Sequence, residues 1–214
     1  MRDQDVQDRE ELNQREGCSP FQANIWGEIA KMVELEPGDI FSTKGKGILG
    51  WLSRNLMAPL TDRFHYGLVW EKVDDDYFIL ESISKGIAIG RLFFYEGGDI
   101  KFYRVDCPNE LRGQAPVELT RWGRSLYDYL LIPKLAIQGI ALFIKQLFTE
   151  GRFRRIRAEE LTWVQNNSFL CTEAVDIAYD AVGVNIIPIG TCPVPSAFKQ
   201  AEIDGRITEI KEAS

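Results

Sequence analysis

The first half of the chain contains short apolar runs, separated by turn residues, that predict β-strands. Such runs occur at residues 40–42, 64–70, 77–83, 86–90 and 100–105. The runs at 64–70 and 77–83 flank an acidic turn at 74–76, a pattern typical of a hairpin. Because the connections between runs are short, an antiparallel sheet of about five strands is expected.

The second half changes to the apolar spacing of helices. Helices are predicted at residues 117–130, from Pro133 to about Phe148, and across Cys171 to about Val182, where Gly183 ends the helix. The polar residues 165–168 are typical of a loop and an N-terminal cap. Pro133 is expected to break or kink any helix that precedes it. The proline-containing tail is expected to be irregular, with at most one short strand.

Domain organisation follows from these patterns and from the charge near the N-terminus. Residues 1–18 are expected to form a flexible charged lead, and residues 19–33 a short helix that begins at Ser19-Pro20. Apolar residues at helical spacing also occur over residues 48–60. The predicted fold class is α+β: residues 19–214 form one domain, an antiparallel sheet packed on the helix that bears Cys171, with a helical insertion at about residues 117–160.

Composition excludes several classes of protein. The 214 residues are 45% hydrophobic, enough for the core of one large domain. The net charge of −7 argues against binding nucleic acid by phosphate neutralisation. The four cysteines are scattered and form no CxxC pair, which argues against a disulfide framework and a zinc site. No cofactor or metal is implied.

Targeting signals are not evident in the pattern. Residues 1–17 carry six acids and three arginines, unlike a secretory signal peptide. The apolar stretch at 135–144 is about half the ~20 residues of a spanning helix, so no transmembrane segment is predicted. The protein is therefore expected in the cytoplasm where it is made, unless it is released by lysis or carried in an assembly such as a phage particle.

Three residues are candidates for catalysis. Cys171 is predicted in or near the first turn of a helix, where exposed amides and the helix dipole lower a thiol pKa. His65, the only histidine, is the only imidazole base near neutral pH. Glu81, on the paired strand, could hold the imidazole of His65. The alternatives are a buried core cysteine, a structural histidine and a solvated glutamate. Asp39 is expected to cap its turn.

These residues belong to blocks that resemble a known family. The blocks occur in the order Pro37-Gly38-Asp39-Ile40, Phe64-His65-Tyr66-Gly67-Leu68-Val69, Leu80-Glu81-Ser82 and Leu170-Cys171-Thr172-Glu173-Ala174-Val175. This order resembles the circularly permuted papain-like cysteine hydrolases, in particular the YiiX-like branch of the NlpC-related superfamily, with lecithin-retinol acyltransferase-type enzymes as more distant kin. The resemblance covers roughly residues 37–182. It implies Cys171 as nucleophile, His65 as base and Glu81 as the orienting residue.

The resemblance implies a thiol hydrolase that cleaves an amide or ester through an acyl-enzyme. A peptidoglycan-type peptide amide is the expected substrate, and an acyl-amide or lipid is the alternative. A non-catalytic assembly or binding module, for example in a phage particle, is the rival hypothesis. The long segment before Cys171 and the missing export signal depart from a cell-wall enzyme. Residues 135–148 are interpreted as a buried core helix, which an arginine-rich run follows. Alternatively, residues 135–157 contact a membrane surface or a protein assembly.

Overall fold

The computed structural model describes residues 34–44, 54–95, 98–123, 125–151, 154–164 and 168–211. The chain divides into two units: Leu35–Lys211, and Met1–Glu34 together with Glu212–Ser214. The predicted lead at residues 1–18 and the predicted helix at 19–33 lie outside the described residues and stay predictions. The architecture below is that of the Leu35–Lys211 unit.

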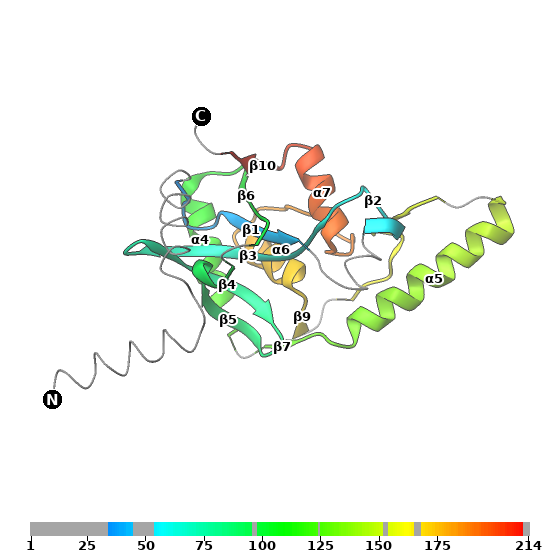
Figure 1. Cartoon of the computed structure of the whole chain (residues 1–214), viewed down its shortest axis with the longest axis horizontal. Coiled ribbons are helices and arrows are strands. Elements are labelled where there is room, and N and C mark those ends of the chain that lie inside the picture. Colours follow the sequence, from blue (N-terminus) through cyan, green and yellow to red (C-terminus); the bar gives the residue numbers. More distant parts are fainter. Residues whose placement is uncertain are drawn as a thin grey trace. The chain divides into compact units, whose positions relative to one another are not determined.

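A six-stranded antiparallel sheet is the centre of this unit (Figure 1). Its order is β10-β6-β1-β3-β4-β5, so the predicted α+β class is confirmed. The prediction of about five strands omitted β10, which the C-terminal tail adds at the edge beside β6. The strands are β1 (Ile40–Lys44), β3 (Arg63–Val73), β4 (Asp76–Ile83), β5 (Gly86–Arg91), β6 (Ile100–Val105) and β10 (Ile207–Ile210).

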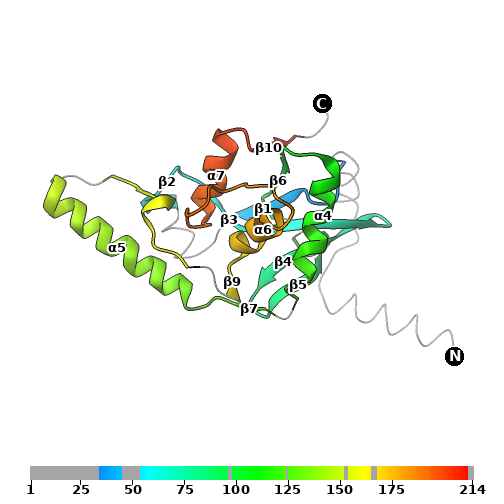
Figure 2. The same ribbon diagram turned by 180° about the vertical axis from the view of Figure 1, so that it is seen from behind.

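The helices α4, α6 and α7 cover one face of the sheet, and two short parallel strand pairs connect other segments of the chain. In Figure 2, α6 lies between α4 and α7 against the sheet. The helices are α4 (Asn109–Thr120), α5 (Leu131–Glu150), α6 (Cys171–Asp180) and α7 (Pro195–Ile203), with the 3₁₀ turns η1 (Leu92–Tyr95) and η2 (Ala158–Glu160). Two parallel pairs are β2 (Met57–Ala58) with β8 (Ile156–Arg157), and β7 (Leu126–Tyr127) with β9 (Ser168–Phe169).

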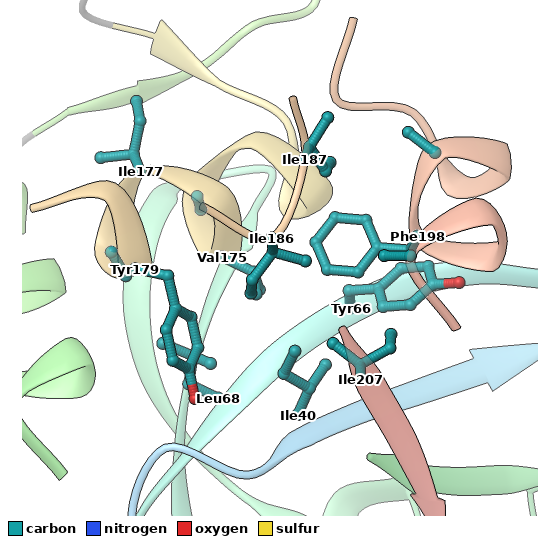
Figure 3. Close-up of a cluster of buried hydrophobic side chains, with 14 of the residues drawn as sticks. Ile40, Tyr66, Leu68, Val175, Ile177, Tyr179, Ile186, Ile187, Phe198 and Ile207 are labelled. Carbon is teal, nitrogen blue, oxygen red and sulfur yellow. The ribbon is translucent and has the colours of Figure 1, made fainter. Parts of the chain in front are cut away.

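The core lies between α6, α7 and the helix-facing side of the sheet (Figure 3). Alternate residues of β3 point to this side, and among them Tyr66 packs on Phe198 of α7 with ring centroids 4.7 Å apart. Tyr179 of α6 is fully buried, and its hydroxyl donates a 2.5 Å hydrogen bond to the carbonyl of Gly38. Thus α6 is fixed to the sheet by apolar burial and by a polar contact at the entry to β1.

Asp39 anchors the turn that leads into β1, as the sequence predicts. Its carboxylate accepts a 2.8 Å hydrogen bond from the backbone N–H of Glu36 and is fully buried. Arg104 of β6 donates two hydrogen bonds to the same carboxylate, at 2.9 and 2.7 Å. Burial of this charge is tolerated because it is paired and hydrogen-bonded. Asp39 therefore has a structural role.

Several element predictions are wrong. The helix predicted at 117–130 is displaced, because α4 spans Asn109–Thr120 and the chain then turns into β7. Pro133 does not break a helix: it lies in the first turn of α5, where its missing N–H has no helical partner to lose. The tail contains a helix that the prediction missed, α7, which begins at Pro195, and the single short strand expected there is β10. Of the helical spacing at 48–60, residues 48–53 lie outside the described residues, residues 54–56 are helical, and 57–58 form β2.

The core-helix interpretation of residues 135–148 is also wrong. Both views show α5 extending away from the sheet (Figures 1 and 2), and most of its apolar side chains are exposed or half-buried. By length and composition alone, its span Leu131–Thr149 could cross a membrane, the one such helix found among the described residues. The uncharged stretch at 135–144 is shorter than this helix, because α5 continues through the exposed residues Lys134 and Lys145 at the two ends of that stretch.

The sheet requires a glycine where three strands align. Gly67 of β3 stands opposite Phe41 of β1 and Glu81 of β4. A Cβ at Gly67 would lie 2.4 Å from Cε1 of Phe41 and 2.8 Å from the backbone oxygen of Leu80. Both distances are below van der Waals contact, so Phe41 and the backbone of β4 leave no room for a side chain.

Gly67→Ala is expected to destabilise the protein by about 1–3 kcal/mol, since the new methyl group must displace the Phe41 ring. Urea unfolding followed by circular dichroism measures the change. Gly113→Ala in α4 is the matched control: a Cβ there meets nothing within 4 Å. This control should stabilise by up to about 1 kcal/mol. Equal effects of the two substitutions would contradict the argument.

Candidate active site

Cys171 begins α6 beside the start of β3. It is the first residue of the helix, and its Sγ lies 3.6 Å from the carbonyl oxygen of Phe64. The thiol also faces the backbone N–H groups of Tyr66 and Thr172. Pairing of β3 with β4 begins only at Gly67, so Cys171 occupies the strand edge that β4 leaves uncovered. The helix start is therefore built into the end of the sheet.

The local sequence sets this helix start differently from the prediction. Ser168 and Phe169 form β9, and Leu170, with extended backbone, is the N-cap. No side chain of Leu170 can cap the helix, but its backbone N–H donates a 3.2 Å hydrogen bond to Glu173 Oε2. Ser168 is thus part of a strand and does not cap the helix, and residues 165–167 lie outside the described residues.

The structure brings His65 and Glu81 to Cys171. Nε2 of His65 lies 2.5 Å from Oε2 of Glu81, and the Cys171 thiol lies near enough to the imidazole for each group to shift the pKa of the other. Since Nε2 faces the carboxylate, Nδ1 is the ring nitrogen left for the thiol. The order thiol, imidazole, carboxylate is the geometry of a catalytic triad. The catalytic roles of all three residues stay predictions.

Two glycines make room for the Glu81 carboxylate on the sheet face that carries His65. Gly67 stands directly across β3 from Glu81, so no side chain separates Glu81 from His65 two residues earlier on the same face. On β5, a Cβ at Gly90 would lie 2.9 Å from Glu81 Oε1. Phe41 packs edge-on against His65, with ring centroids 6.1 Å apart. The two glycines thus leave space for the Glu81 carboxylate, and the ring of Phe41 packs against the imidazole.

Tyr95 is a site residue that the sequence did not reveal. It ends η1, and its hydroxyl donates a hydrogen bond to Glu81 Oε2 and lies 3.1 Å from His65 Nε2. Burial and the nearby Glu81 charge raise the pKa of Tyr95, so its hydroxyl remains a donor. The sequence signal is weak: one tyrosine among aromatic residues 93–95, four residues after the last strand residue. Only folding places it beside Glu81.

Electrostatics favour an ion pair between the thiol and the imidazole. Burial opposes charge on both groups, but the hydrogen bond to Cys171 and that to Glu81 raise the pKa of His65 to about 10. Burial likewise raises the pKa of the Cys171 thiol, yet the hydrogen bond and charge of His65 lower it below the ordinary value of 9.0. The thiolate and imidazolium therefore stabilise one another.

The other cysteines differ. Burial raises the pKa of Cys192 to about 12, and burial also raises that of Cys107. These shifts favour the neutral thiol, whereas the shift of the Cys171 pKa favours the thiolate. Cys18 lies outside the described residues. Across the described ranges, no group of three or more His, Cys, Asp or Glu side chains could hold a metal ion.

An apolar pocket opens on the side of Cys171 that faces α5. Its volume is about 140 Å³. The α5 residues that line it lie at helical spacing, and the other walls include residues from β2, β3, β7, β8 and the first turns of α6 and α7. Its lining includes Met57, Phe64, Ile132, Leu135, Ala136, Gly139, Ile156 and Cys171. Cys171 is thus one of the residues that line the pocket.

Comparison with known proteins adds nothing to this geometry: the chain matches no protein-family model, and the search of curated proteins gave no match. The resemblance to permuted papain-like hydrolases therefore stays a prediction.

The Cys171–His65 contact predicts a measurable change in titration. Cys171→Ala should lower the pKa of His65 from about 10, because the thiolate that holds its proton is removed. The lone histidine permits direct measurement by NMR of the imidazole carbons against pH. Cys107→Ala is the control and should leave the titration unchanged. An unaltered His65 titration in Cys171→Ala would show that the thiol does not engage the imidazole.

The same contact has a stability consequence with a fixed sign. The pKa of His65 in the folded protein lies above its ordinary value of 6.5. The protonated form is therefore favoured by folding, and this stabilisation is complete below pH 6.5 and lost as the pH rises through about 10. The difference in unfolding free energy between wild type and His65→Ala, measured in urea, should shrink across that range.

Proposed function

We propose that the protein is a thiol hydrolase of the permuted papain-like kind, which cleaves an amide or ester bond through an acyl-enzyme on Cys171. The observation that carries the proposal is the position of the only imidazole: His65 lies between a thiol at a helix N-terminus and the carboxylate of Glu81. An isolated buried cysteine would not need this arrangement. The order of the sequence blocks supports the same family.

The mechanism begins with attack of the Cys171 thiolate on the substrate carbonyl carbon. A carbon–sulfur bond forms, and the carbonyl electrons move to oxygen. When the intermediate collapses, the bond to the leaving amine or alcohol breaks, and the His65 imidazolium gives that group its proton. Neutral His65 then takes a proton from water, which attacks the thioester and regenerates Cys171. Glu81 stabilises the imidazolium throughout.

The first turn of α6 supplies the stabilising donors. The initial backbone N–H groups of a helix have no partner within the helix, and they are aligned with its dipole. At α6 these groups begin with the N–H of Cys171 itself. They would donate hydrogen bonds to the developing oxyanion, the largest single contribution in many acyl-transfer sites. Tyr95 and Phe41 restrict the imidazole to the orientation that this sequence of steps needs.

The test is hydrolysis of p-nitrophenyl acetate, a small soluble ester. Cys171→Ala should abolish turnover, and His65→Ala should lower kcat/KM by at least about a hundredfold, the range of general acid–base catalysis. Cys107→Ala, which changes a thiol remote from His65, should retain the wild-type rate. If Cys171→Ala hydrolysed the ester as fast as wild type, the proposed function would be refuted and the assembly-module hypothesis favoured.

The pH profile provides a second test. The rate should rise as the Cys171 thiol ionises below its ordinary pKa of 9.0 and fall as His65 loses its proton near pH 10. The descending part of kcat/KM against pH therefore belongs to the imidazolium as proton donor. A profile that keeps rising beyond pH 10 would contradict the assigned role of His65.

A further inference from the structure

α5 has two different apolar faces. Its inner face lines the pocket beside Cys171 through Ile132, Leu135, Ala136 and Gly139, which recur at helical spacing. Its outer face exposes a second stripe to solvent, in which Phe148 is 88% exposed. The other members are Ile137, Ile140, Ile144 and Leu147, each at least 44% exposed. One helix thus joins an apolar pocket at the nucleophile to an apolar outer surface.

The base of α5 is attached to the catalytic unit. β7, which ends four residues before α5 begins, pairs with β9, and Phe169 of β9 lies two residues before Cys171. Midway along the helix, the side chain of Gln138 exchanges hydrogen bonds of 3.0 and 2.7 Å with the backbone of Thr162. The helix is therefore held alongside the unit near the pocket. Any external surface that contacts the outer stripe at this part of α5 would therefore lie close to the pocket.

Charge indicates what that surface is. The chain as a whole has a net charge of −7, yet residues 131–157 contain six basic residues and one acid. By the helical period, Lys134 and Lys145 share one flank of the outer stripe. Beyond the helix, Arg155 and Arg157 are exposed, whereas Arg154 pairs with Glu160 at 2.7 Å. A basic apolar stripe in an acidic protein is complementary to an anionic lipid bilayer.

The pocket is suited to a chain of carbon atoms. Its volume of about 140 Å³ is close to that of cavities that take up benzene-sized apolar guests. Several lining residues are half-buried, among them Ile132, Leu135 and Ala136, so the pocket communicates with the surface on the α5 side. A polar peptidoglycan stem peptide would leave its charged and amide groups unpaired there.

We propose that α5 docks the protein on an anionic lipid bilayer and that the pocket receives the acyl chain of a lipid ester or amide whose carbonyl reaches Cys171. This inference rests on the proposed thiol chemistry of that residue. The acyl group passes from the lipid oxygen or nitrogen to Sγ: a carbon–sulfur bond forms, the carbon–oxygen or carbon–nitrogen bond breaks, and the released alcohol or amine part of the lipid takes the proton of His65. Water then frees the fatty acid and restores the thiol.

Docking is tested by sedimentation of the full chain with vesicles of phosphatidylcholine alone or with an equal part of phosphatidylglycerol. Binding should require the anionic lipid and weaken at high salt. Phe148→Ser should weaken binding at least about tenfold, because it removes a largely exposed phenyl ring that would enter the bilayer. Val117→Ser is the matched control: Val117 is an exposed apolar residue on α4, and its loss should leave vesicle binding unchanged.

Substrate class is tested with p-nitrophenyl esters from acetyl to octanoyl. Wild type should prefer octanoyl, and Ala136→Phe, which fills the pocket, should lower the octanoyl-to-acetyl ratio of kcat/KM at least about tenfold. A thermal melt of this variant establishes that it is folded. Faster turnover of a muropeptide than of the octanoyl ester, or an unchanged ratio in folded Ala136→Phe, would overturn the acyl-chain assignment.

The two proposals fail separately. Cys171-dependent acetyl ester hydrolysis without vesicle binding overturns docking and leaves the thiol hydrolase intact. A concentration-dependent dimer that Phe148→Ser abolishes, without vesicle binding, assigns the stripe to a second copy and also overturns docking. Vesicle binding without any Cys171-dependent turnover overturns the proposed function, and the lipid substrate with it.

Discussion

The register between β3 and β4 is the constraint on which the candidate site depends. Gly67 stands opposite Glu81, which brings the carboxylate within reach of His65 two residues earlier on β3. A shift by one residue would move Glu81 to the opposite face of the sheet. The same glycine accommodates the ring of Phe41, which supports the imidazole. One position without a side chain therefore determines both the spacing and the support of the imidazole.

Cys171 reaches this arrangement from the end of the sheet. Residues such as Val175 and Tyr179 pack in the core and fix the axis of α6. The first residue of the helix, Cys171, then contacts the carbonyl of Phe64 on β3. The thiol is nearly buried, at 6% exposure, so its charge depends on His65 more than on water. This explains why the thiol at a helix start has a lowered pKa while Cys192, also buried, has a raised one. The presence of His65 beside Cys171 therefore decides whether the pKa of a buried thiol is lowered or raised.

α5 extends from the candidate site to the outer surface of the molecule. The chain leaves the body after β7, forms a long apolar helix and returns to β9 immediately before Cys171. Its inner residues complete the pocket, and its outer residues have no core to enter. A contiguous exposed apolar stripe on a folded protein often marks an interaction surface. The proposals of acyl transfer and of membrane docking thus concern two faces of one element.

Local pattern determined much of this protein. Short apolar runs between turn residues predicted five of the six sheet strands and the hairpin that carries His65 and Glu81, because such runs and turns are local properties of the sequence. The sequence alone also shows that His65 is the only histidine and predicts Cys171 at the start of a helix. Only the tertiary structure placed Tyr95 beside Glu81 and put α5 outside the core. Residues far apart in the chain decide both, through strand register and the burial that neighbouring elements provide, and no local window contains that information.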